Sequence, residues 1–316
     1  MTLDKIARVR AALRSEQVDR IPASFSYHFP EEMRAGHAMA QAHLDYYRTA
    51  DPDYLKVMND NYYSAPDLEV LSEPSDWAKM KEAPLSSQCF QDQLEGLREI
   101  VKTVGNKVPV ITTVFNPFQN GDGTSEWKAT EHLKSDPEKV SEGLATVAHS
   151  LEGFVRACIE AGASGIFFAA HGGQRSRHSD EEFDKYIKPH DLSVLKAAND
   201  AGAWFNLLHV CGENVRLSAY TDYPAQAMNW APQLGNPSLR EARKLYRRTI
   251  VGGMKQDGAL VSGSKEDIVS EVQRAVREMG STGFMLGAGC ALAKAVPAER
   301  LLWAKQALHE NQEVPQ

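Results

Sequence analysis

The segment Gly165-Ile166-Phe167-Phe168-Ala169-Ala170 is a wholly apolar run that ends in His171-Gly172-Gly173. A short run without polar alternation is typical of a strand that is buried on both faces of a parallel sheet. A long helical stretch, 137–161, precedes this run, and a second one, 191–201, follows it. A buried strand between two helices indicates an α/β fold, in which parallel strands are joined by helices.

Further apolar runs alternate with helical stretches along the whole chain. The predicted strands are 20–25, 53–58, 108–114, 165–170, 204–212, 225–230, 249–253 and 283–287. The predicted helices are 3–14, 37–50, 91–104, 137–161, 191–201, 238–246, 264–279 and 297–309. Eight strands alternating with helices predict a single (β/α)8 TIM barrel with an N-terminal helical extension, and a doubly wound sheet is the alternative. One barrel domain over residues 1–316 fits the length of the chain.

The composition is that of a globular protein with a large core. The 316 residues are 42% hydrophobic and 24% charged, and the formal net charge of -7 argues against nucleic acid as the main partner. The N-terminal segment lacks the apolar core of a signal peptide, and no stretch approaches the length of a membrane span. Four cysteines are too few for a disulfide framework in a chain of this length. We therefore expect a reduced, cytoplasmic protein.

In a barrel, reactive groups gather at the carboxyl ends of the strands. Reading the predicted strand ends in order gives Tyr27 and His28, Asp60, Asn116, His171, His209 with Cys211, Asn229 with Trp230, Lys255, and Cys290. We expect the substrate pocket to be lined by Tyr27, His28, Asn116, Asn229 and Trp230. His171 and Asp60 are the candidate catalytic residues: the imidazole as an acid, a base or a substrate-orienting group, and the carboxylate as a partner for a cation. A structural hydrogen-bonding role is the alternative for both, and a core position is the alternative for Trp230.

A candidate metal site follows from His209-Val210-Cys211 at the end of one strand and from Cys290 after the last strand. Residues i and i+2 of a strand point to the same side, so His209 and Cys211 share a face. An imidazole and two thiolates suit Zn²⁺, and three protein ligands leave a fourth position open, as in catalytic zinc sites. The alternative is that the cysteines are small buried hydrophobic residues.

Several sequence pieces, taken in their order and spacing, are similar to a known family. They are Val18-Asp19-Arg20-Ile21-Pro22, Leu208-His209-Val210-Cys211-Gly212, Asn229-Trp230, Val251-Gly252-Gly253, and the run from Gly283 to Cys290 with Pro297 after it. On these pieces the chain resembles the uroporphyrinogen decarboxylase superfamily over nearly its whole length. It is most similar to the zinc-dependent branch that contains methylcobamide:coenzyme M methyltransferases and related O-demethylase components. The resemblance implies the barrel fold and implies His209, Cys211 and Cys290 as zinc ligands.

The function that this resemblance implies is methyl transfer between a corrinoid (cobalamin) and a small-molecule thiol or methyl ether. No corrinoid-binding domain is visible in this chain, so the corrinoid is expected on a separate partner protein, and a homodimer is left open. Cobalamin-independent methionine synthase has a comparable zinc site with an added Glu. No acidic residue stands near Asn229 and Trp230, so water or substrate is expected to complete the zinc site here.

Two other functions remain possible from the sequence. The decarboxylase itself carries an arginine-rich loop after the first strand, whereas no Arg occurs here between Arg20 and Arg34. This difference argues against a porphyrinogen with many carboxylates as substrate. One alternative is therefore a decarboxylase or lyase that acts on another substrate. The other is a catalytically silent barrel that binds a corrinoid protein or a small ligand.

Overall fold

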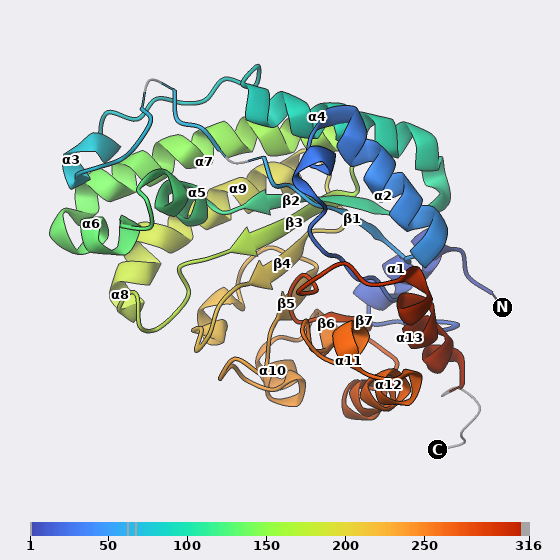
Figure 1. Ribbon diagram of the computed structural model, residues 1–316. Helices are drawn as coiled ribbons and strands as arrows, with labels where there is room; N and C mark the ends of the chain where they lie inside the picture. Colours follow the sequence, from blue (N-terminus) through green and yellow to red (C-terminus); the bar gives the residue numbers. More distant parts are fainter. Residues whose placement is uncertain (1, 62, 67, 311–316) are drawn as a thin grey trace.

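A curled sheet of seven parallel strands forms the centre of the molecule (Figure 1), in a computed structural model that describes residues 2–61, 63–66 and 68–310. Neighbouring strands follow one another in sequence from β1 to β7. The strands are β1 (Leu55–Val57), β2 (Val110–Phe115), β3 (Gly165–Ala170), β4 (Leu207–Val210), β5 (Ala227–Trp230), β6 (Thr249–Met254) and β7 (Phe284–Ala288). This order confirms the predicted α/β class and makes the fold TIM-barrel-like.

The helices join the strands and cover the outer face of the sheet (Figure 1). The eight predicted helices correspond to α1 (Lys5–Leu13), α2 (Gly36–Ala50), α4 (Gln88–Val104), α7 (Pro137–Glu160), α9 (Lys188–Asp200), α10 (Leu239–Leu245), α12 (Lys265–Met279) and α13 (Ala298–Glu310). Shorter helices lie in the connections: η1 (Glu31–Met33), α3 (Pro74–Trp77), η2 (Gly105–Lys107), α5 (Pro117–Thr124), α6 (Ala129–Ser135), α8 (Asp180–Glu182), η3 (Phe183–Ile187), η4 (Leu217–Tyr220) and α11 (Ala259–Ser262).

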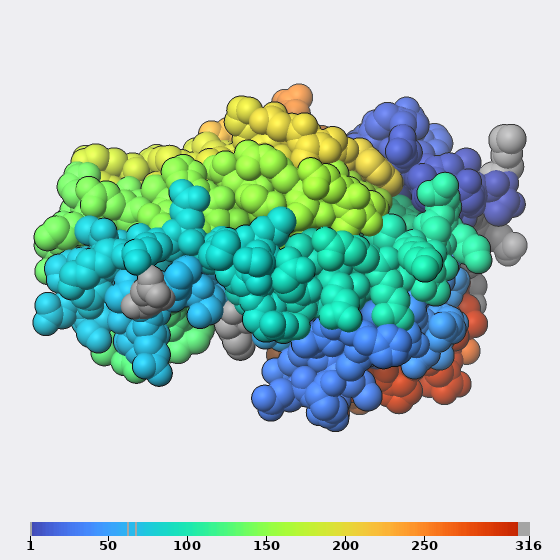
Figure 2. All heavy atoms as spheres, turned by 90° about the horizontal axis from the view of Figure 1, so that it is seen from above, coloured from blue at the N-terminus to red at the C-terminus, as the bar shows by residue number. Residues whose placement is uncertain are grey.

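Helix ends follow the local sequence signals. Ser264 and Asp267 form a capping box at the start of α12. Asp136 caps α7, with Pro137 at its first position. Figure 2 shows α7 between α4 and α9 on one side of the molecule, and α7 contacts both of these helices. No helix in the described part of the chain is long and apolar enough to cross a membrane.

The segment 20–25, predicted as the first of eight strands, lies between β7 and β1 without forming a strand. It makes one parallel bridge, between Ala23 and Leu286. On the other side, the Asp53 amide donates to the Ala23 carbonyl at 2.9 Å. The ladder stops there because Pro22 has no N–H and because the Ala23 N–H donates to the Asp53 carboxylate at 2.8 Å. The sheet described here therefore has seven strands where the sequence predicts eight.

An inner apolar core fills the space enclosed by the curled sheet. Its buried residues are Val9, Ala12, Tyr54, Ile111, Phe167, Ala169, Phe205, Leu207, Ala227, Val251 and Met285. Along a strand these residues alternate with side chains that pack under the helices, as the period of two requires. The N-terminal helix α1 supplies Val9 and Ala12, and the Thr249 hydroxyl at the start of β6 donates to the Ala12 carbonyl at 2.8 Å. The N-terminal extension therefore covers the amino-terminal end of the barrel.

Candidate metal centre

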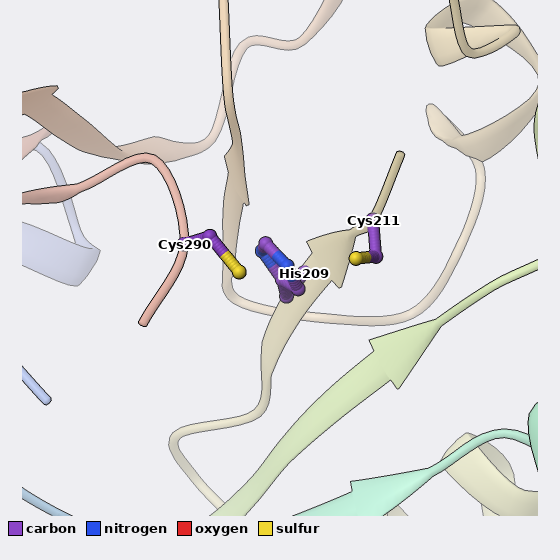
Figure 3. Close-up of side chains that lie close together, drawn as sticks. All are labelled: His209, Cys211 and Cys290. Carbon is purple, nitrogen blue, oxygen red and sulfur yellow. The ribbon is translucent and has the colours of Figure 1, made fainter. Parts of the chain in front are cut away.

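Three side chains that the sequence singles out meet at the carboxyl ends of the strands (Figure 3). His209 lies in β4, Cys211 directly follows β4, and Cys290 comes two residues after β7. Their ligand atoms all lie within 4.8 Å of one another. The structure thus brings the three residues together as expected, while their binding of a metal stays a prediction.

Asn229 in β5 sets the orientation of the His209 ring. The Asn229 amide donates to the carbonyls of Val251 at 2.9 Å and Ala288 at 3.0 Å, which turns its oxygen toward His209. The His209 Nδ1 atom lies 2.6 Å from this oxygen and therefore carries the proton. The Nε2 atom on the other side of the ring is left as the acceptor. This partner arrangement is the one that metal-ligating histidines usually have.

The buried Nε2 atom of His209 has no hydrogen-bond partner in the described part of the chain. Buried polar atoms nearly always have a partner, so an unpartnered nitrogen in such a position needs an explanation. A metal ion between Nε2 and the two sulfur atoms would satisfy it. The residues present therefore fit a zinc ion.

The two thiols act on each other's ionisation. The Cys211 thiol donates a hydrogen bond to Cys290, which lowers the pKa of Cys290 and raises the pKa of Cys211. The nearby Lys56 also favours the Cys290 thiolate, although burial opposes it. One proton thus leaves the pair readily and the second is held between the sulfur atoms. A divalent metal ion would replace that shared proton, because metal ligation requires thiolates.

Two glycines let the segments that carry the cysteines approach. Gly212 has φ +118°, a conformation that other residues rarely adopt, and a Cβ atom there would lie 2.6 Å from the side chain of Gln174. A Cβ atom at Gly289 would lie 2.8 Å from the Cα of Ala231. Larger residues at either position would push Cys211 or Cys290 out of place.

His171 follows β3 next to this cluster and is half-buried. Burial lowers the pKa of its imidazole to about 4, and the neighbouring His209 adds to the shift, so the ring is neutral at pH 7. The Asn116 amide group holds the His171 backbone through its oxygen at 3.2 Å and its nitrogen at 3.0 Å. Asn116 is fully buried and also donates to Asp191 at 3.0 Å. The Asn116 amide therefore makes its hydrogen bonds within the protein, and the predicted roles of Asn116 and His171 stay predictions.

Two more predicted residues, His28 and Asp60, form a pair. His28 Nδ1 lies 2.8 Å from one Asp60 oxygen, and Arg34 Nε lies 3.6 Å from the other. Asp60 thus lies near the Arg34 guanidinium and the His28 ring, and its catalytic role stays a prediction. Tyr27 packs edge-on against Tyr46 at 5.7 Å between ring centroids, and burial raises the pKa of Tyr27.

Trp230 and Lys255 stand apart from the cluster. The indole of Trp230 is fully buried under the helices, and its N–H donates to the Pro237 carbonyl at 2.8 Å. Lys255, directly after β6, is exposed. The pocket-lining role of Trp230 stays a prediction. Of Trp230 and its neighbour Asn229, Asn229 is the one that lines the interior cavity.

Lys56 is a site residue that the sequence reading missed. Its position in the middle of the predicted strand 53–58, before the strand end, gave no reason to select it. Its ammonium nitrogen lies 3.6 Å from the centroid of the Phe167 ring, inside the sheet. A lysine between the apolar residues Leu55 and Val57 was the signal that could have identified it.

Comparisons with known proteins agree with this architecture. The model of the uroporphyrinogen decarboxylase (URO-D) family matches residues 56–311. A methyltransferase from Methanosarcina mazei has a similar structure, with a TM-score of 0.77 and 19% identity over 98% of this chain and 99% of that chain. A B12-independent methionine synthase from Shewanella sp. W3-18-1 has a TM-score of 0.59 and 10% identity over 93% of this chain and 98% of that chain. At these identities the likeness shows a shared fold. No curated protein matches the chain.

Proposed function

We propose that this chain, which belongs to the uroporphyrinogen decarboxylase family, is a zinc-dependent methyltransferase acting between a corrinoid and a thiol or methyl ether. The observation that carries the proposal is the cluster of His209, Cys211 and Cys290, whose ligand atoms lie within 4.8 Å of one another. The unpartnered Nε2 atom of His209 supports a metal at this place. The similar fold of a methyltransferase from Methanosarcina mazei supports the type of reaction.

In this proposal His209, Cys211 and Cys290 hold the zinc ion, and water or substrate takes the remaining position. The ion would supply Lewis acidity, which lowers the pKa of a substrate thiol or polarises the oxygen of a methyl ether. Asn229 keeps the Nε2 atom of His209 free by accepting the proton on Nδ1. The two cysteine thiolates offset the charge of a divalent ion, which keeps a substrate thiolate reactive and favours a thiol as the methyl acceptor.

The other residues at the rim would handle the substrate. His171 is neutral at pH 7, so its ring can orient the substrate or accept a proton. Asp60, paired with His28, would orient a polar group, and Tyr27 would form part of the pocket wall. We further propose that the corrinoid is carried by a separate protein, that the enzyme is cytoplasmic, and that a homodimer is compatible with this function.

A methyl-transfer assay tests the proposal, with methylcobalamin as the corrinoid and 2-mercaptoethanol as the acceptor. Loss of the methylcobalamin absorbance and the mass of the S-methyl product report the reaction. We expect zinc-loaded protein to accelerate the transfer by at least about 100-fold over the protein-free mixture, because a metal-held thiolate is a far better nucleophile than a free thiol. Metal-free protein should lose this acceleration.

Parallel assays with a methyl ether and with uroporphyrinogen as substrates distinguish the rival functions. A zinc-loaded protein that transfers no methyl group to a thiol or from a methyl ether would refute the proposal. Release of carbon dioxide from uroporphyrinogen at about one turnover per second would instead favour a decarboxylase. We expect no such release, because the segment between Arg20 and Arg34 contains no Arg to bind the substrate carboxylates.

A further inference from the structure

Lys56 is a buried cation that the proposed function does not yet use. Only 8% of its surface is exposed, and its ammonium donates to the Ser26 hydroxyl at 3.3 Å. Within the residues that the structure describes, no carboxylate lies at ion-pair distance from this ammonium, and Asp60 is paired with His28. A buried charge without an opposite partner is costly, so the surroundings of Lys56 favour an anion.

The Phe167 ring places the Lys56 ammonium beside the metal-ligand cluster. The ammonium nitrogen lies 3.6 Å from the ring centroid, and the His209 ring stacks on the same phenyl ring with centroids 5.3 Å apart. A cation over an aromatic face is attracted by the ring, so this contact holds the ammonium in place without cancelling its charge. Lys56 and His209 therefore contact the same phenyl ring inside the sheet.

A small cavity is lined both by Lys56 and by Cys290, one of the three residues of the cluster. Its lining includes Lys56, Phe167, Asn229 and Cys290. Its free volume of about 20 Å³ accommodates roughly one water-sized group. A single sulfur or oxygen atom fits such a space better than a bulky acid group does. The geometry points to one small anionic atom between the ammonium and the cluster.

The charges of Lys56 and of the proposed zinc site determine whether an anionic or a neutral ligand binds better. Two cysteine thiolates and one divalent ion sum to zero, which leaves the positive charge of Lys56 without compensation. The partners of the Lys56 ammonium, the Phe167 ring and the Ser26 hydroxyl, are both neutral and do not cancel its charge. A thiolate would balance this charge, whereas a neutral ether or thioether would not.

We propose that Lys56 is the specificity-determining residue of the site, and that its ammonium selects a thiolate over a neutral ether or thioether ligand. The inference rests on the proposed function, since it takes the cluster to hold zinc. It explains the preference for a thiol substrate by a residue that is not a metal ligand. Lys56 acts through its charge on the bound ligand and needs no proton transfer.

Calorimetry with a matched pair of ligands tests this role. 2-Mercaptoethanol and 2-(methylthio)ethanol differ by one methyl group, and each is titrated into zinc-loaded wild-type, Lys56→Met and Lys255→Met proteins. We expect Lys56→Met to weaken thiol binding by about 30-fold or more, because loss of one partner of a buried charge pair is costly. Thioether binding should change by less than about threefold. Lys255→Met removes an exposed lysine at the same rim and should leave both affinities unchanged.

Two further variants separate charge from packing. Lys56→Arg keeps the charge and should retain thiol affinity within about tenfold, whereas Lys56→Gln keeps a polar chain and should behave like Lys56→Met. Unchanged thiol affinity in Lys56→Met and Lys56→Gln, with zinc content intact, would overturn the role of Lys56 alone. A wild-type protein that holds no zinc or binds no thiol would instead refute the proposed function, and the role of Lys56 with it.

Discussion

At the scale of single residues, a chain of contacts leaves one nitrogen of His209 free for a metal ion. Asn229 accepts the Nδ1 proton at 2.6 Å and is itself held by two backbone carbonyls. Such partners of metal-ligating histidines fix both the ring orientation and the proton position. The site is thus built from the ligand and from the residue that orients it.

Asn229→Ala should therefore weaken zinc binding by about 10- to 100-fold, because the His209 ring loses its preferred proton position. Competition with a chromogenic chelator measures the affinity. Asn206→Ala is the matched control. The buried Asn206 side chain accepts a hydrogen bond from the Ile166 N–H at 3.0 Å, at the opposite end of the barrel. That variant should lose stability and keep its zinc affinity. Equal zinc affinity in Asn229→Ala and wild type would contradict the role of Asn229.

Part of the site was predictable residue by residue, and part was not. His209 and Cys211 share a face because the strand period is two, and this follows from spacing alone. The same rule means that Asn229 and Trp230 cannot both face the interior, but spacing does not say which of them does. Lys56 was missed because its environment is made by Phe167, a residue more than a hundred positions away, and no local pattern encodes that contact.

At the scale of elements, α9 and the end of β2 support the segment that follows β3. Asp191 in α9 accepts from Asn116 at 3.0 Å and from the Tyr223 hydroxyl at 2.9 Å, and Asn116 in turn holds the His171 backbone. Burial raises the pKa of Asp191 to about 7, although both hydrogen bonds favour the carboxylate. A buried carboxyl group therefore takes part in positioning His171.

This carboxyl group gives the fold a measurable pH dependence. The unfolded chain releases the Asp191 proton near pH 4 and the folded chain near pH 7, so the folded state binds more protons between these values. Its contribution to stability is complete below about pH 4 and is lost as the pH rises through 7. When the pH is raised from 5 to 8, the free energy of unfolding of wild type should fall by about 2–3 kcal/mol more than that of Asp191→Asn. Urea unfolding at both pH values measures this, and identical losses would show that Asp191 does not titrate in this way.

The limits of prediction at this scale have physical causes. Long helices such as α7 and α12 were predictable because their apolar periodicity and caps act locally. The short helices in the connections are set by tertiary contacts. The segment 20–25 looks like a strand in isolation, yet the Asp53 carboxylate takes the Ala23 N–H that a longer ladder would need. A hydrogen bond to the distant residue Asp53 thus keeps the segment 20–25 from forming a strand.

At the scale of the whole molecule, the fold gathers polar groups at one end of an apolar interior. The inward positions of β4 are Leu207 and His209, with Cys211 directly after the strand, and those of β5 are Ala227 and Asn229. The helix α1 covers the opposite end. The metal-ligand cluster therefore lies where the sheet opens, which is where barrel enzymes carry their active sites.

Metal analysis of protein purified without added zinc tests the central claim most directly. We expect about one zinc per chain in wild type and in Cys89→Ser, because Cys89 lies outside the cluster. Cys211→Ser and Cys290→Ser should each lose the metal while circular dichroism shows the fold intact, since the apolar cores supply most of the stability. Metal-free wild-type protein that takes up no zinc, or a full equivalent of zinc in Cys290→Ser, would contradict the account.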